Sequence, residues 1–356
     1  MLLVDGSTGE GGGQILRSAI TISTIIGKPI KVANIRSNRK DPGLKHQHVL
    51  TIQLLSRIFN IHTENVSLGS EWIRFEASKD SSRFNEYDGP ANDAIIADIG
   101  TAGSIPLLLQ TLIPTIAISQ KDLVIRLSGG TDVKFSPTID YIQYVLRDAY
   151  SKIGIEFDIN VLKRGFYPRG QGLVEIKIRK ATDLHPIEFC NFKEVEPNII
   201  SIAARLPKHV PERQIGSAIA TLEKKGIRYS KHKSVLENSA SPGSSILIYT
   251  TSESGMYLGA DSIGEKGVKA ELIGNRAAKK FVDDYEFRAC IDQHLADMLV
   301  LPLSFVNGKS RYKISKITSH LLTNLEVIRM LNSIEYHFDK ISENEFILSI
   351  EGNPII

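Results

Sequence analysis

The chain has 356 residues, of which 42% are apolar and 23% are charged, and its formal net charge is +3. This near balance excludes nucleic-acid binding through bulk charge, so any such binding needs a local basic patch. The two cysteines, Cys190 and Cys290, stand far apart and lack a CxxC partner. Their pattern argues against a disulfide framework or a thiolate metal site and favours a reducing compartment.

The longest apolar stretch, residues 105–119, is interrupted by Pro106, Gln110 and Pro114 and is too short to cross a bilayer. Asp5 stands where a signal peptide would need an apolar residue. We therefore expect a soluble, cytoplasmic protein that makes no membrane contact.

Hydrophobic periodicity in the first part of the chain predicts the element order βαβαββ. In chain order, the elements expected within residues 1–80 are a strand at 2–5, a Gly-rich turn, a helix from near Gln14, a strand at 30–36, a polar loop, a helix at 46–59, and strands around Val66 and at 72–76.

Two later parts of the chain repeat this order. The elements expected in the second unit, within residues 94–180, are a turn and helix at 100–118, a strand at 123–127, a polar loop, a helix at 139–153, and strands at 156–161 and 172–178. Those of the third unit are a helix at 295–305, a strand at 312–317, a helix from His320, and strands at 334–339 and 345–351. Three copies of one unit predict an α/β (α+β) fold.

The spacing of the copies indicates an insertion. Ile30 and Leu123 begin equivalent strands and lie 93 residues apart, whereas Leu123 and Tyr312 lie 189 residues apart. The excess of about 96 residues predicts an inserted α/β module before the third unit. The predicted division is a large domain of residues 1–180 with the first two units, the insert at 181–277, and the third unit of the large domain at 278–356.

The insert carries a run of basic side chains. Its predicted elements are strands at 199–205, near 228–231 and at 245–251, helices at 211–225 and after 267, and a Gly-rich segment at 255–267. The basic residues are Arg205, Lys208, Arg213, Lys224, Lys225, Arg228, Lys231 and Lys233. Such a run is typical of a solvated face, and contact with RNA is the alternative.

The loop before each second helix occupies an equivalent position in the three units. These loops are residues 36–47, 129–137 and 315–320. If the copies pack around a common axis, the loops converge on one cleft and bring distant polar residues together.

In the third loop, Thr318 or Ser319 can cap the helix that follows, whose apolar face repeats at helical spacing from Leu321 to Leu331. His320 then lies in the first turn, at the positive end of the helix dipole, where phosphate binds well and a histidine is biased toward its neutral, nucleophilic form. A packing or capping role is the plainer alternative.

A Gly-rich segment at residues 9–13 follows the first strand and opens the first helix, which is the context of a phosphate-binding loop. It lacks the Lys-Ser/Thr of a Walker loop and the last glycine of a dinucleotide fingerprint. Glu10 stands among these glycines, where a phosphate would be expected. A carboxylate near phosphates is explained if a divalent cation lies between them.

Donor side chains gather in the first of the three loops. The set is Arg36, Arg39, Lys40, Lys45, His46, Gln47 and His48. An exposed polar loop and a forked set of phosphate ligands are both open, whereas a zinc pair of His46 and His48 is rejected because residues two apart point to different faces of a helix. Asp297, in an otherwise apolar helix, can be structural or functional.

Taken together, these segments closely resemble the RNA 3′-terminal phosphate cyclase family, in order and over essentially the whole chain. The matching segments are GEGGGQILRS from residue 9, the loop from Arg36 to His48, SGGTD from Ser128, RGFYPRG from Arg164, GEKGVKAE from Gly264, LAD at 295–297 and SHLLTN from Ser319. The resemblance implies three units like the C-terminal domain of translation initiation factor three, with a small α/β domain inserted ahead of the third.

The resemblance also implies a mechanism. A histidine attacks the α-phosphate of ATP, AMP passes from it to the RNA 3′-terminal phosphate, and the neighbouring 2′-hydroxyl displaces AMP to close a 2′,3′-cyclic phosphate. The family's nucleophile matches His320, and its metal-binding glutamate matches Glu10. The residues that match its phosphate contacts are Arg17, Arg36, Arg39 and Gln47, and those that match its nucleotide pocket are Pro137 and Asp297. Its cofactors are ATP and a divalent cation, Mg or Mn, and its partner is RNA with a 3′-terminal phosphate.

This chain departs from the family's pattern at three places. His294 stands in the nucleotide pocket where many members have an aromatic residue, Met298 stands where Gln is common, and the three-glycine run reads Gly170-Gln171-Gly172. The rivals are a non-catalytic, cyclase-like protein of ribosome assembly and an enolpyruvyl transferase built from similar repeats. His320 together with Glu10 and the arginines favours the enzyme, and the insert and SHLLTN disfavour the transferase.

Overall fold

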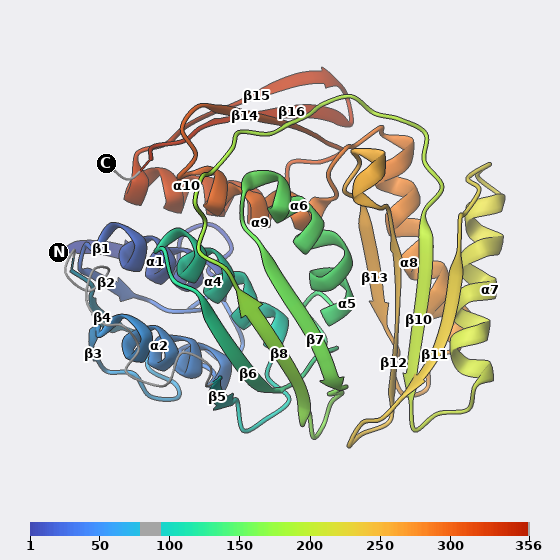
Figure 1. Cartoon of the computed structure of the whole chain (residues 1–356), viewed down its shortest axis with the longest axis horizontal. Helices are drawn as coiled ribbons and strands as arrows, with labels where there is room; N and C mark the ends of the chain where they lie inside the picture. Colours follow the sequence, from blue (N-terminus) through green and yellow to red (C-terminus); the bar gives the residue numbers. More distant parts are fainter. Residues whose placement is uncertain (79–93, 355–356) are drawn as a thin grey trace.

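The computed structural model describes residues 1–78 and 94–354. These residues form four four-stranded sheets with helices packed against them (Figure 1). Among the described residues, no helix combines the length and the apolar character that a membrane span needs.

The first sheet shows the pattern that the others repeat. The elements are β1 (Leu2–Asp5), α1 (Gly13–Ile26), β2 (Ile30–Ala33), α2 (His46–Phe59), β3 (His62–Glu64) and β4 (Ile73–Glu76). The strands lie in the order β1-β2-β4-β3, with β1 and β2 parallel and the other pairs antiparallel.

The second sheet has the same order, β5-β6-β8-β7. Its unit contains β5 (Ile95–Asp98), α4 (Ile105–Ile118), β6 (Leu123–Gly129), α5 (Ile139–Tyr141), the π-helical turn η1 (Ile142–Leu146), α6 (Arg147–Ile153), β7 (Phe157–Lys163) and β8 (Gly172–Ile178). In α4, 12 of 14 residues are buried, because helices α1, α2 and α9 and the strands β6 and β8 pack around it.

The third sheet repeats the order as β9-β14-β16-β15, which confirms the three βαβαββ units. Its unit contains β9 (Glu188–Phe189), α9 (Gln293–Leu303), β14 (Lys309–Ile314), α10 (Ser319–Asn332), β15 (Glu335–Ser342) and β16 (Glu345–Glu351). Helices α1, α4, α9 and α10 of the three units pack together between the sheets, and one continuous apolar core runs through all three units.

The position of the insertion differs from the expectation. Strand β9 pairs in parallel with β14, through Glu188 with Arg311 and Phe189 with Tyr312, so the third unit begins before the insert and is interrupted after its first strand. The insert was expected ahead of the whole unit because a two-residue strand leaves almost no hydrophobic pattern in a sequence.

The inserted segment has a sheet of its own, in the order β11-β10-β12-β13. It contains β10 (Asn198–Ala204), α7 (His209–Glu223), β11 (His232–Glu237), β12 (Gly243–Tyr249), the 3₁₀ turn η2 (Ser252–Ser254), β13 (Gly259–Ile263) and α8 (Ala270–Glu286). Helix α8 packs on β12, β13 and α7 and continues past residue 277. We therefore propose that the insert extends from the end of β9 to the end of α8, instead of ending at 277.

Several strands begin or end away from their predicted positions. Strand β2 stops at Ala33 because Asn34 and Arg36 take positive φ angles of 53° and 56°. Strand β3 lies before Asn65, which also has a positive φ, instead of around Val66. Strand β14 ends at Ile314, β11 begins at His232, and β5 had not been predicted. Apart from β14, an interior strand of six residues, these are short or edge strands, whose alternation of apolar residues is weak.

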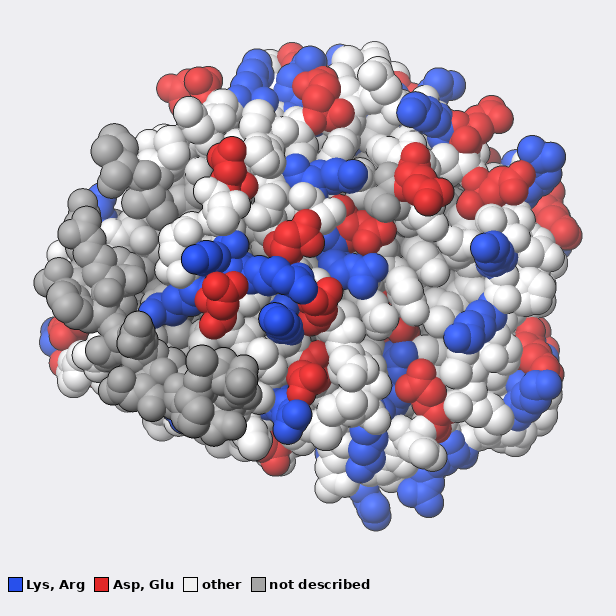
Figure 2. Space-filling view, in the orientation of Figure 1, with Lys and Arg blue, Asp and Glu red and all other residues white. Residues whose placement is uncertain are grey.

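Charges of both signs are mixed on the outer face of the second sheet. Arg126 pairs with Glu175 at 2.6 Å and Arg179 with Asp158 at 2.5 Å. Figure 2 shows red and blue side chains interspersed over the middle of this face. Such mixing fits the small net charge and marks the face as a solvated surface.

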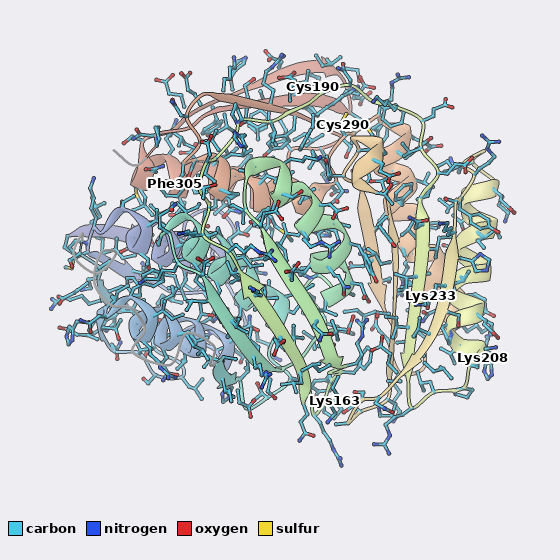
Figure 3. All side chains as sticks on the ribbon, viewed as in Figure 1. Lys163, Cys190, Lys208, Lys233, Cys290 and Phe305 are labelled. Carbon is cyan, nitrogen blue, oxygen red and sulfur yellow. The ribbon has the colours of Figure 1, made fainter. Side chains whose placement is uncertain are left out.

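Both cysteines carry free thiols, and Figure 3 places them in the same part of the molecule, near the third sheet and the insert. Burial raises the pKa of Cys190 to about 12 and that of Cys290 to about 11. Both thiols are therefore protonated at neutral pH and are poor metal ligands and nucleophiles.

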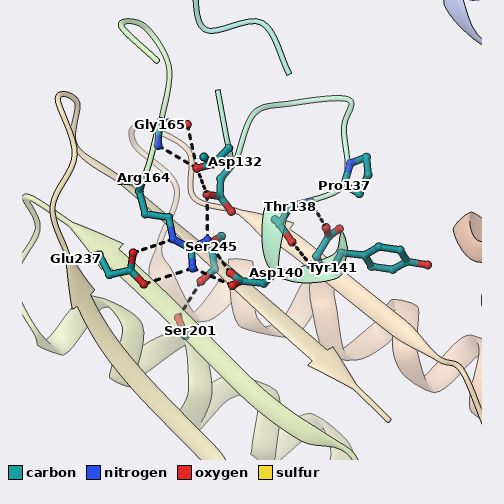
Figure 4. Close-up of polar contacts among 12 residues, drawn as sticks. Asp132, Pro137, Thr138, Asp140, Tyr141, Arg164, Gly165, Ser201, Glu237 and Ser245 are labelled. Carbon is teal, nitrogen blue, oxygen red and sulfur yellow. Dashed lines mark hydrogen bonds and ion pairs between the residues drawn. The ribbon is translucent and has the colours of Figure 1, made fainter. Parts of the chain in front are cut away.

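A buried arginine joins the insert to the second unit (Figure 4). The side chain of Arg164 is only 3% exposed and binds both carboxylate oxygens of Asp140, at 2.8 and 2.9 Å. It also binds Glu237 of β11 at 3.0 Å and Asp132 at 3.4 Å. The guanidinium, Asp140 and Asp132 are held out of water, whereas Glu237 is 29% exposed, so the buried charges depend on one another as partners.

We predict that Arg164→Met lowers the free energy of unfolding by about 3–5 kcal/mol, because it leaves buried carboxylates without a cation. The matched control is Arg126→Met, which breaks an ion pair of similar length in which Arg126 is 49% exposed, and which should cost less than about 1 kcal/mol. Urea unfolding midpoints measure both. Equal losses in the two variants would show that the Arg164 cluster adds nothing beyond a surface pair.

Candidate active site

His320 lies in the first turn of α10, as the sequence predicts. Thr318 caps the helix, because its Oγ1 accepts a hydrogen bond from the backbone N–H of Leu321 at 3.0 Å. The predicted apolar face is buried from Leu321 to Leu331 and packs on α1 and α9. Gln14 of α1 donates to the carbonyl of His320 at 3.1 Å. These contacts hold the imidazole at the positive end of the helix.

Glu10 contacts the imidazole directly. Its Oε2 lies 2.7 Å from Nε2 of His320 and 3.6 Å from Nη2 of Arg39. The Gly-rich turn reaches α10 because Gly9, with φ of 56°, has no side chain: a Cβ there would lie 2.1 Å from Oγ1 of Thr323. The predicted convergence of the first and third units is thus present at the level of individual atoms.

The electrostatic surroundings of His320 favour its neutral form. Burial lowers its pKa, Arg17 and Arg39 lower the pKa further, and Glu10 opposes them. The side chain remains 46% exposed, so a ligand can reach the ring. A neutral imidazole has a free lone pair and can act as a nucleophile.

Asp297 of α9 lies behind His320. Its Oδ2 is 4.0 Å from Nδ1 of His320, and its Oδ1 accepts a hydrogen bond from Thr318 at 3.4 Å. Burial raises its pKa to about 8, and the charges of Asp292 and Glu10 contribute to the rise. Without a ligand, Asp297 is therefore largely protonated at neutral pH and can donate as well as accept a hydrogen bond.

Two arginines differ in how free they are to bind a ligand. Burial lowers the pKa of Arg17 to about 10, and no acidic side chain among the described residues forms an ion pair with it. Arg36 donates to the backbone carbonyls of Asp41 at 2.8 Å and Gly43 at 3.1 Å, so part of its guanidinium holds its own loop. A half-buried arginine without a counter-ion is suited to an anion such as phosphate.

His48 is a site residue to which sequence reasoning assigned no separate role. It is buried, its Nδ1 accepts a hydrogen bond from the backbone N–H of Lys45 at 3.1 Å, and burial with the charges of Arg17 and Arg36 lowers its pKa to about 3. It is a neutral histidine that positions the start of α2. Its place three residues after the N-cap, where a capping-box side chain stands, is the signal that could have found it.

The loop of the second unit is linked to Gln47 of the first unit. The Oε1 of Gln47 accepts a hydrogen bond from the backbone N–H of Ser104, the N-cap of α4, at 2.9 Å. The hydroxyl of Ser104 lies 2.5 Å from that of Ser136, next to Pro137. Ser104 thus bridges the loops of the first and second units, as Glu10 bridges those of the first and third. Ser104, which the sequence reasoning missed, precedes Pro106 in the pattern of an N-cap.

His294 and Asp297 lie three residues apart at the start of α9. The backbone N–H of His294 donates to Asp292 at 2.9 Å, and its ring stands edge-on to Tyr141 with 6.5 Å between ring centroids. Pro137 directly precedes Thr138, whose hydroxyl accepts from the backbone N–H of Tyr141 at 3.3 Å. His294 and Thr138, the residue after Pro137, therefore both contact Tyr141, although they come from different units.

The described residues contain no group of three or more His, Cys, Asp and Glu side chains that could hold a metal ion by themselves. Glu10 offers one carboxylate, which already contacts His320 and Arg39. A divalent cation at Glu10 would need further oxygen ligands from a phosphate or from water. Mg²⁺ is usually bound in this way, by one or two carboxylates with phosphate and water, instead of by protein ligands alone. The metal role of Glu10 stays a prediction.

Comparisons with known proteins agree with this geometry. The family model for RNA 3′-terminal phosphate cyclase matches residues 8–338. Proteins named RNA 3′-terminal phosphate cyclase are 41% identical in Saccharolobus solfataricus, over 92% of this chain and 94% of that protein, and 38% identical in Caldivirga maquilingensis, over 93% and 92%.

A solved structure of the enolpyruvyl transferase NikO from Streptomyces tendae aligns with 99% of this chain and 48% of its own, at 11% identity and a TM-score of 0.36, which is too low to inform either fold or function. The sequence relatives and the family model cover nearly the whole chain, including the segments that carry Glu10, Arg39 and His320. The chain therefore belongs to the RNA 3′-terminal phosphate cyclase family.

Proposed function

We propose that this chain converts the 3′-terminal phosphate of an RNA into a 2′,3′-cyclic phosphodiester and consumes ATP in doing so. The observation that carries the proposal is a neutral, reachable histidine at a helix N-terminus, with Glu10 at 2.7 Å and Arg39 beside it, in a member of this family. A histidine in this state is suited to attack phosphorus.

In the first step, a ring nitrogen of His320 attacks the α-phosphorus of ATP. The new N–P bond replaces the bond from that phosphorus to the oxygen that bridges to the β-phosphate, pyrophosphate leaves, and the ring proton passes to solvent. The amides of the first turn of α10 and the positive end of its dipole face the negative charge that develops.

In the second step, an oxygen of the RNA 3′-phosphate attacks the adenylyl phosphorus, which breaks the N–P bond and restores His320. In the third step, the 2′-hydroxyl attacks the RNA phosphorus, loses its proton, and displaces AMP. Activation by AMP is needed because a phosphate oxygen alone is a poor leaving group, whereas AMP is a good one.

The other site residues would bind the nucleotide. Arg17 and Arg39 would contact phosphate oxygens, and Arg36 and Gln47 would support them from the loop that they hold in place. Pro137, His294 and Asp297 would contact the base and ribose. Glu10 would hold a divalent cation, Mg or Mn, which would neutralise phosphate charge when bound.

The alternative, a non-catalytic cyclase-like protein of ribosome assembly, is disfavoured by the presence of His320 with its acidic and basic partners. ATP as the nucleotide and a cytoplasmic location stay predictions.

We predict that the protein mixed with α-labelled ATP and a divalent metal gains an acid-labile label, and that His320→Ala abolishes it. His337→Ala is the matched control, because His337 is 74% exposed on β15, pairs with Asp339 on the surface, and should leave the label unchanged. Label is measured after acid precipitation. Label that survives in His320→Ala would refute the assignment of the nucleophile.

On its acid side, the pH dependence of the labelling rate should follow the protonation of His320. Because the pKa of His320 is lowered from its usual value of 6.5, the imidazole is neutral above about pH 6.5, and its protonation should lower the rate only below that value. Initial rates between about pH 4.5 and 7 test this, below the range around pH 8 in which Asp297 titrates. A fall in rate with an apparent pKa above about 6.5 in this range would contradict the lowered pKa of His320.

Glu10→Gln separates a metal role from an electrostatic one. Glu10 opposes the lowering of the His320 pKa, so its removal leaves the imidazole neutral at pH 8, and a purely electrostatic role predicts no loss of label there. If Glu10 holds the cation, we expect a loss of about tenfold or more and a higher metal concentration for half-maximal rate. An unchanged metal dependence would exclude the metal role.

A further inference from the structure

Two aromatic side chains are strongly exposed to solvent, in loops that are linked to the candidate active site through the start of α4. Phe135 is 99% exposed and Tyr167 is 77% exposed, whereas the next most exposed Phe, Tyr or Trp among the described residues, Trp72, is 41% exposed. Exposed rings cost solvation free energy and are uncommon singly at such values, so two in neighbouring loops need an explanation.

Phe135 is also held in an unfavourable backbone conformation. Its φ is +63°, a region that bulky residues rarely adopt. The loop is fixed on both sides, since Lys134 pairs with Glu265 at 2.5 Å and the hydroxyl of Ser136 lies 2.5 Å from that of Ser104. The ring is therefore presented outward by a restrained loop, which is the pattern of strain kept at a functional position.

The loops that carry the two rings are fastened to each other. The backbone N–H of Thr131 donates to the carbonyl of Gly165 at 2.8 Å, and that of Gly165 donates to the hydroxyl of Thr131 at 2.9 Å. Below them, Arg164 binds Asp132 and Asp140 (Figure 4). The two rings therefore project from one rigid platform, between the end of β6 and the turn from β7 to β8.

This platform adjoins the site of His320 through the start of α4. Gly170, at the end of the Tyr167 loop, packs so closely on this segment that a Cβ would lie 2.7 Å from Cα of Ala102. Ser104, two residues on, binds both Gln47 of the active-site loop and Ser136. The active-site loop and the platform are therefore joined through residues 102–104.

Basic side chains border the rings. Arg169 follows Tyr167 in the same turn and is exposed, and Lys163 ends β7. Neither forms an ion pair with a described acidic residue, in contrast to the paired charges of the neighbouring sheet face. Figure 3 places Lys163 at the lower edge of the molecule, where Figure 2 shows Lys and Arg side chains gathered. Unpaired cations with exposed rings are the combination that binds single-stranded nucleic acid.

We propose that Phe135 and Tyr167 stack on unpaired bases at the 3′ end of the RNA, while Arg169 and Lys163 contact its backbone phosphates, so that the terminal phosphate is directed to His320. The inference rests on the proposed function, because it names how the RNA of that reaction is held. Stacking requires accessible base faces, so the platform selects a single-stranded 3′ end over a base-paired one.

The test compares binding, the ATP half-reaction and cyclisation in the full-length chain. The probe is a fluorescent, single-stranded oligoribonucleotide of about ten nucleotides with a 3′-phosphate. Phe135→Ala with Tyr167→Ala should weaken its binding, measured by anisotropy, by about tenfold or more and raise KM for cyclisation similarly. The label on His320 from ATP should be unchanged, because neither ring touches the residues assigned to that step.

Two further variants keep the test decisive. Phe135→Trp should bind the oligonucleotide as the unchanged protein does, because it retains a stacking face. Phe135→Leu, which is apolar without a ring, should bind it more weakly. Phe287→Ala, which removes an aromatic 38% exposed at the end of α8, is the control and should bind as the unchanged protein does. A blunt duplex with the same 3′-phosphate should bind equally to all variants.

Unchanged binding and KM in the double variant would overturn the platform while leaving the proposed function intact. Equally weak binding in Phe135→Leu and Phe135→Trp would also overturn it, because an aromatic ring would then not be what binds the RNA. Absence of label and of cyclic product in the unchanged protein would instead refute the proposed function, and the anisotropy comparison would still decide whether the rings bind single-stranded RNA.

Discussion

The site depends on the close packing of α10 against α1, which brings the third unit onto the first. Gln14 binds the carbonyl of His320, Ser18 binds Asn324 at 3.1 Å, and the bare backbone of Gly9 lies against Thr323. Only with this approach can Glu10 reach the imidazole at 2.7 Å. The nucleophile and its acidic partner are therefore positioned by the contact between α10 and α1, which also holds the Gly-rich turn that carries Glu10.

The same packing creates an electrostatic environment that is unfavourable without a ligand and favourable with an anion. Arg17 is half-buried and has no acidic partner among the described residues, two histidines are held neutral, and Asp297 is largely protonated because burial raises its pKa to about 8. Folding supplies the free energy that keeps these groups desolvated, and a bound phosphate would return it. Sites of this kind are organised before the substrate arrives.

The insert is part of this organisation, since it interrupts the third unit instead of preceding it. Strand β9 and helix α9 belong to one unit but flank the whole insert. His294 and Asp297 of α9 therefore follow the insert directly in the chain. Arg164 ties the insert to the loops that carry Phe135 and Pro137. A displacement of the insert would thus also displace the platform and the residues on the nucleotide side of the site.

The sequence by itself determined the three-unit fold and the helices at His46–Phe59 and Ser319–Asn332, because periodicity, capping and local motifs depend on neighbouring positions. It could not locate β9 or β5, whose few residues carry no period, or the roles of His48 and Ser104. Only the tertiary structure decided which nitrogen of His320 faces Glu10, that Arg17 has no counter-ion in the part of the chain that is described, and that the ring of Phe135 is exposed. Those properties arise from burial and from distances between residues far apart in the chain, which no local pattern encodes.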